Sequence, residues 1–190
     1  MPLPDLLSGA ILFFFIPLWL LVGFGDWLFH RKTHISETSG AGESLLHLLM
    51  LGEVGLPMLA GLFLEINALV LALMIAGFLA HEATVLWDLR YTANKRAILP
   101  GEQVIHSYQE TIPLMLLVLV AILHWDQFMA LITLAEHADY RLAWKSDPVP
   151  PAYLVGIIVA AALLVVLPFL EELWRCYRQA AARRIAPTLQ

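Results

Sequence analysis

The sequence predicts an all-helical integral membrane protein with five transmembrane helices. Of its 190 residues, 60% are hydrophobic and only 14% are charged, whereas soluble domains are about half apolar and ~25% charged. Two stretches, 6–25 and 149–170, carry no charge, and each has the ~20 residues that a helix needs to cross a hydrocarbon core of ~30 Å. The single cysteine, Cys176, excludes an intrachain disulfide and a cysteine-based metal cluster.

Three further apolar stretches are too short to cross a membrane alone, since they cover only ~16–22 Å at 1.5 Å per residue. Each becomes long enough if its helix continues into a neighbouring polar segment, and all three of these segments carry histidine and acidic residues. The five helices are therefore expected at about 6–34, 43–65, 66–92, 101–124 and 150–178. No linker or repeat divides them, so residues 1–190 are predicted to form a single transmembrane domain.

Turn-forming residues fall between the predicted helices. Gly40 and Gly42 mark the turn after the first helix. Pro100 and Gly101 mark the start of the fourth, where proline is tolerated because its missing N–H has no partner in the first turn. A cluster of prolines precedes the fifth helix. The long connection before it is expected to include a short interfacial helix around Trp125–Leu142.

The positive charges of the loops predict the orientation of the chain. They follow the first, third and fifth helices, at Arg31, Lys32, Arg90, Lys95, Arg96, Arg175, Arg178, Arg183 and Arg184. Cationic loops stay in the cytoplasm, so we expect the N-terminus outside and the C-terminus in the cytoplasm. The expected location is a bacterial inner (plasma) membrane.

This orientation brings the polar ends of four helices to the cytoplasmic side. Their histidines and carboxylates are spaced four or seven residues apart, so those of each helix share a face. An ionisable group at membrane depth costs at least ~2.5–3.5 kcal/mol and normally faces the bundle interior, so this many groups need partners. We predict a metal site with the ligand candidates Asp26, His30, His34, Glu43, His47, His81, Asp88, Glu102, His106 and Glu110.

The size of this set indicates two metal ions. One zinc ion takes about four protein ligands at most, whereas di-metal sites in helix bundles use a larger set of carboxylates and histidines. Iron is the expected metal, with zinc and manganese as alternatives. No catalytic residue is assigned. Four further residues are expected to form hydrogen bonds to the ligands without binding the metal themselves: Glu53, Glu37, Arg90 and Arg96.

The segment DWLFHRKTH, residues 26–34, resembles the Asp-x3-His-Arg-x2-His box of the membrane fatty-acid hydroxylase and sterol desaturase group. Members of that group hold two metal ions at the cytoplasmic ends of transmembrane helices and use dioxygen on lipids. The resemblance implies that His30 and His34 are metal ligands. The His-x2-His-His boxes of the group do not occur in this sequence.

We therefore expect a membrane-embedded di-iron oxidoreductase that hydroxylates or desaturates a lipid or another apolar molecule at the cytoplasmic side. The expected partners are this substrate, membrane lipids and a cytoplasmic electron donor, because the sequence contains no nucleotide-binding loop. No nucleic-acid partner is expected.

Two other functions stay open from the sequence. A haem b electron-transfer protein would use two axial histidines, for example His47 with His106 or His30 with His81. A zinc-dependent lipid hydrolase would use one metal ion to activate water, with a glutamate as general base.

Overall fold

The computed structural model describes residues 1–185 and is all-helical, with 80% of the chain in helices and no strand in that range. This confirms the predicted helical class. The elements are α1 (Leu3–Ala10), α2 (Ile16–Lys32), α3 (Ala41–Phe63), α4 (Ala68–Thr92), α5 (Pro100–Leu123), α6 (Trp125–Thr133), α7 (Pro151–Ala161) and α8 (Leu167–Ile185). A π-helical turn joins α1 to α2 and another joins α7 to α8, so each pair forms one long helix.

Within residues 1–185, five helices are long and apolar enough to cross a membrane, as predicted, and they indicate a membrane protein. Their bounds are Leu3–Lys32, Ala41–Phe63, Ala68–Thr92, Pro100–Leu123 and Pro151–Arg183. Large apolar side chains such as Phe13, Leu56 and Leu163 are more than half exposed on the outside of the bundle. A contiguous exposed apolar surface of this kind is typical of helices that contact lipid.

Local signals explain where several helices begin and end. Asn67 caps α4 by accepting a hydrogen bond from the Val70 backbone N–H at 3.2 Å, as a good N-cap residue does. A turn of four residues, 64–67, therefore separates α3 from α4, although the sequence predicted consecutive helices at 43–65 and 66–92. The helix after α5 is also shorter than predicted. It ends at Thr133, where Leu134 adopts a left-handed backbone conformation.

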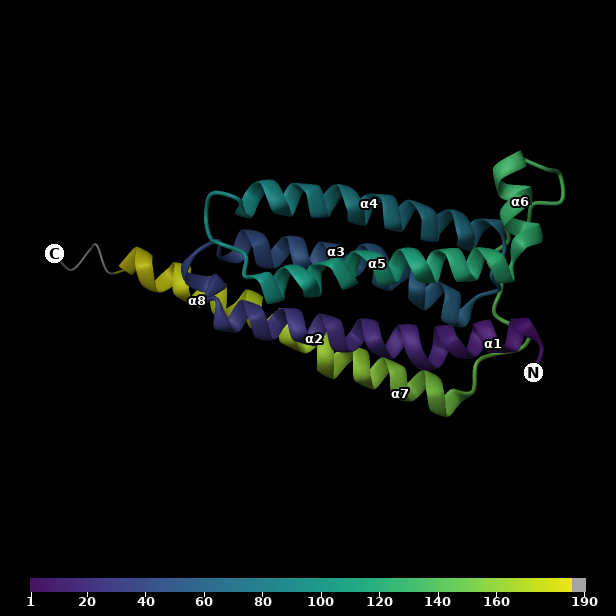
Figure 1. Cartoon of the computed structure of the whole chain (residues 1–190), viewed down its shortest axis with the longest axis horizontal. Coiled ribbons are helices and arrows are strands. Elements are labelled where there is room, and N and C mark those ends of the chain that lie inside the picture. Colours follow the sequence, from purple (N-terminus) through teal and green to yellow (C-terminus); the bar gives the residue numbers. More distant parts are fainter. Residues whose placement is uncertain (186–190) are drawn as a thin grey trace.

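The helices run along one long axis, with α3 packed on α4, α2 on α5, and α8 on both α2 and α3 (Figure 1). The N-terminus and α6 lie at one end of the bundle, which we call the α6 end, and α8 lies at the other (Figure 1). At this other end α2 and α4 finish while α3 and α5 begin (Figure 1). We call it the polar end, because buried charged residues gather there.

Candidate metal centre

His30 on α2 lies at the middle of the polar end and is fully buried. Its Nδ1 atom is 2.9 Å from Glu172 Oε2. Its Nε2 atom is 3.3 Å from Asp26 Oδ1, one turn earlier on the same helix, and 3.5 Å from Glu102 Oε1 on α5. One imidazole therefore faces carboxylates from three helices.

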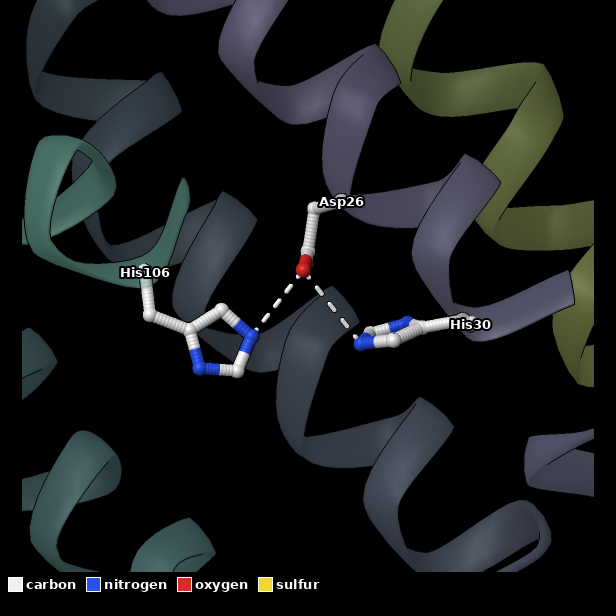
Figure 2. A group of neighbouring side chains, drawn as sticks. All are labelled: Asp26, His30 and His106. Atoms are coloured by element: carbon white, nitrogen blue, oxygen red, sulfur yellow. Dashed lines mark hydrogen bonds and ion pairs between the residues drawn. The ribbon is translucent and has the colours of Figure 1, made fainter. Parts of the chain in front are cut away.

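The first group of potential metal ligands consists of Asp26, His30 and His106. The Asp26 carboxylate lies between the two imidazole rings, with Oδ1 at 3.0 Å from His106 Nε2 (Figure 2). One potential ligand atom from each of the three residues lies within 4.8 Å of the others. These residues could hold a metal ion, since imidazole nitrogens and carboxylate oxygens suit iron, manganese and zinc.

The second group consists of His30, Glu43 and His47, whose potential ligand atoms also lie within 4.8 Å of one another. The rings of His30 and His47 are stacked, with centroids 4.5 Å apart. His47 lies 3.7 Å from both Asp88 Oδ2 and Glu172 Oε1. Because His30 belongs to both groups, the two candidate sites adjoin.

Arg96 supplies positive charge beside both groups. Its side chain is 3% exposed and lies between two fully buried carboxylates, those of Glu43 and Glu102. Its Nε atom donates to both oxygens of Glu43 at 3.1 Å, and one terminal nitrogen donates to Glu43 and, at 2.5 Å, to Glu102. Burial acts to lower the pKa of Arg96, but the two carboxylates outweigh it and raise the pKa above its usual value. The guanidinium therefore stays charged.

The donor atoms of this cluster are not all satisfied by protein groups. Within residues 1–185, buried ligand-type atoms without a hydrogen-bond partner include His30 Nε2, His47 Nδ1, Asp88 Oδ1 and Glu172 Oε1. Buried polar groups normally have a partner, and exceptions call for an explanation such as an ion. The residues present thus fit a bound metal.

Apart from His34, the remaining predicted ligands lie beside the two groups rather than in them. His81 and Glu110 line a cavity of about 70 Å³ together with Asp26, Asp88 and His106. Both ring nitrogens of His81 are buried without a partner among the described residues.

Of the four residues expected to hydrogen-bond to ligands, only Arg96 does so within residues 1–185. Arg96 contacts Glu43 and Glu102, as described above. Glu53 accepts a hydrogen bond from the Thr84 hydroxyl at 2.8 Å, across from α4 to α3. Arg90 is exposed and makes no hydrogen bond or ion pair within residues 1–185. Glu37 is exposed, and its backbone carbonyl accepts a hydrogen bond from Arg183.

His34 does not share a helical face with Asp26 and His30, so its predicted place was wrong. The first long helix ends at Lys32, two residues before the predicted bound. The Thr33 hydroxyl donates to the Phe29 carbonyl at 2.9 Å, and His34 has a positive φ of 54°. This turn carries the His34 side chain out to an exposed position, away from both ligand groups.

Glu172 on α8 is the main site residue that sequence reasoning missed. It is fully buried and contacts both His30 and His47. Its neighbour Glu171 instead accepts hydrogen bonds from Trp27, Arg31 and Arg175 near the surface. The signal was its position: the pair directly follows the uncharged stretch 149–170, at the level where the other helices become polar.

Comparison of the chain with protein-family models, with curated proteins and with solved structures finds no match. The functional argument therefore depends on the chemistry of the site.

Proposed function

We propose that this chain is a membrane-embedded, metal-dependent oxidoreductase whose centre binds two metal ions, with iron as the expected metal. The observation that carries the proposal is the pair of adjoining histidine and carboxylate groups that share His30. Asp26 and His106 would hold one ion, and Glu43 and His47 the other. Glu172 and Asp88 lie within reach of His47 and offer unpaired oxygens.

When bound, a pair of redox-active ions supplies the reduction of dioxygen, with electrons from an external donor, and the oxidation of an unactivated C–H bond. The protein contributes the surroundings of that chemistry. Trp19, Val165 and Phe169 form apolar walls of the 70 Å³ cavity beside Asp26 and His106. These apolar side chains beside the ligand groups would contact an apolar substrate, which supports hydroxylation or desaturation of a lipid.

The proposed orientation places the metal centre on the cytoplasmic side of a bacterial inner membrane. Its support is the cationic residues of the polar end, which are Arg31 and Lys32 in the last turn of α2 and Lys95 and Arg96 in the loop between α4 and α5, because cationic residues near helix ends stay in the cytoplasm. In this orientation a cytoplasmic electron donor reaches the chain at the polar end, where α8 extends beyond the bundle (Figure 1).

The geometry favours metal ions over haem and over a single zinc ion. The rings of His30 and His47 are stacked face to face 4.5 Å apart, so no porphyrin fits between them, and the Asp26 carboxylate occupies the space between His30 and His106 (Figure 2). Haem ligation also needs no carboxylates, whereas five surround these histidines. One zinc ion would leave several of them without a role.

Elemental analysis of the protein purified in detergent, combined with an absorption spectrum, tests the proposal. We expect about two iron ions per chain and no Soret band. The His47→Ala variant should lose bound metal, and the matched control His137→Ala should keep it, because His137 is a 61% exposed loop residue. Metal-free protein that still oxidises lipid, or a Soret band, contradicts the proposal.

A further inference from the structure

A second and larger cavity lies within the apolar part of the bundle, between the metal centre and the α6 end. Its volume is about 200 Å³, and its walls are almost wholly apolar, with Ile16, Met58, Phe78 and Leu116 among them. We call it the outer chamber. A cavity of ~150 Å³ lined by such side chains stays dry and binds apolar ligands, so the outer chamber is large enough for a segment of alkyl chain.

The outer chamber and the cavity at the metal centre are stacked along the same helix faces. On α5 the metal-centre cavity is lined by His106 and Glu110 and the outer chamber by Pro113, Leu116 and Val120. These positions follow one another at three- and four-residue steps, which is one stripe of a helix. The other three helices show the same succession, listed from the centre outward as Asp26, Gly23, Trp19, Ile16 and Leu12 on α2 and the preceding turn, His47, Met50, Val54 and Pro57 on α3, and Asp88, Val85, His81, Phe78 and Met74 on α4.

The outer chamber becomes polar and basic where it reaches the α6 end. Lys145 and His124 line it there. The Lys145 backbone N–H donates to the Phe63 carbonyl at 3.0 Å, which fixes its segment against the end of α3. The nearby Glu65 carboxylate accepts two hydrogen bonds from Ser146, at 2.6 and 2.7 Å. Among residues 1–185, Lys145 forms no direct ion pair, although the carboxylates of Glu65 and Asp147 lie near enough to attract its half-buried ammonium group.

We propose that the outer chamber binds the alkyl chain of an anionic single-chain lipid, with the head group at Lys145 and His124 and the chain directed toward the metal centre. His124 and His106 are 18 positions apart along α5 and its end, which corresponds to ~27 Å of helix. The carbons nearest to the centre are therefore those farthest from the head group. Only the role of this lipid as the substrate rests on the proposed function. Binding of the lipid in the outer chamber needs no metal.

Photo-crosslinking of the full chain in detergent tests the inference. The probe is palmitate with a diazirine at the far end of its chain, and the labelled residues are mapped by mass spectrometry. We expect labelling of chamber residues, Phe78 and Leu116 among them. A second palmitate probe, with the diazirine next to the carboxylate, should label the segment around Val149.

Two pairs of variants separate the chamber from the outer surface of the bundle. Leu116→Trp fills the chamber and should abolish labelling inside it. The matched control Leu114→Trp, two residues away, should not, because Leu114 is 43% exposed on the outside. Lys145→Glu should reduce labelling about fivefold, equivalent to the ~1 kcal/mol of a partly exposed charge pair. The exposed residue Lys95, changed to Glu, serves as its control.

The head group of the probe identifies the source of the lipid. A probe with a trimethylammonium head group in place of the carboxylate should label the chamber weakly, because the Lys145 ammonium group repels its positive charge. A lysophospholipid probe with a phosphate ester is then compared with palmitate. Stronger chamber labelling by the lysophospholipid indicates a membrane lipid, stronger labelling by palmitate indicates a free fatty acid, and either result supports the inference.

Labelling that survives Leu116→Trp, or that falls only on outward-facing residues, overturns the inference. Chamber labelling in protein that binds no metal supports it while contradicting the proposed oxidoreductase. Bound metal without chamber labelling contradicts the chamber alone. The site of labelling in the unaltered protein decides the matter even if a variant fails to fold.

Discussion

Replacement of Arg96 by methionine is the sharpest test of how the polar end is held together. Methionine keeps much of the length of the side chain but removes the charge that lies between Glu43 and Glu102. Both carboxylates are fully buried, and the guanidinium is 3% exposed. Removal of one partner from a buried ionic cluster leaves uncompensated charge and costs ~3–5 kcal/mol. We therefore expect Arg96→Met to destabilise the metal-free protein by that amount.

Thermal unfolding of the protein in detergent measures this loss. For a chain of this size, ~3–5 kcal/mol corresponds to a fall in Tm of roughly 6–20 °C. The control Arg90→Met should shift Tm little, because Arg90 is exposed and has no ion pair within residues 1–185. Equal Tm values for the two variants would refute the reasoning.

Added metal gives the second half of the test. An ion that binds only the folded state at a concentration 100 times its Kd stabilises that state by ~2.7 kcal/mol. If an ion of the proposed centre binds Glu43 or Glu102, it shares them with Arg96 in the natural protein, and in Arg96→Met it would have both carboxylates to itself. Iron or manganese should therefore raise Tm more in the variant than in the natural protein. A smaller rise in the variant means that these carboxylates do not contact the metal.

Three further outcomes follow from the geometry. Glu172→Gln should lower metal content, measured by elemental analysis, because Glu172 contacts His30 and His47. Its control, Glu171→Gln, should leave metal content unchanged, since Glu171 pairs with Arg31 and Arg175 near the surface. His34→Ala should also leave metal content unchanged, because His34 is exposed beyond the end of α2, and a loss of metal there contradicts the described turn. A cysteine introduced as Lys95→Cys should react with a membrane-impermeant reagent only from the cytoplasmic side and one introduced as Asp126→Cys only from outside, and the reverse pattern contradicts the proposed orientation.

The five long helices were predictable because two apolar stretches are long enough by themselves and three become long enough when their helices continue into neighbouring polar segments. Their ends were less so, because single side chains fix them. The four-residue spacing of Asp26, His30 and His34 indicates one helical face only while the helix continues, and the bond from Thr33 to the Phe29 carbonyl belongs to a turn that ends it. A two-residue difference in length thus removes one predicted ligand from the cluster.

Glu172 shows why the ligand set was incomplete. A carboxylate that directly follows an apolar span normally lies in the headgroup region, and the sequence distinguishes poorly between Glu171 and Glu172. The packing of α8 against α2 and α3 turns one of them inward to His30 and His47 and leaves the other near the surface. Contacts between helices so far apart in the sequence have no local signal, so only the level of the residue along its helix could have indicated a role.

Charge balance gives an independent reason to expect two ions. Five carboxylates at the polar end are at most 5% exposed, those of Asp26, Glu43, Asp88, Glu102 and Glu172. Within residues 1–185, Arg96 is the only arginine or lysine that forms an ion pair with any of them, through Glu43 and Glu102, so four negative charges remain when the carboxylates are ionised and the histidines are neutral. Uncompensated buried charges are strongly unfavourable. Two divalent ions neutralise all four charges with neutral imidazoles as ligands, whereas one divalent ion leaves two charges buried.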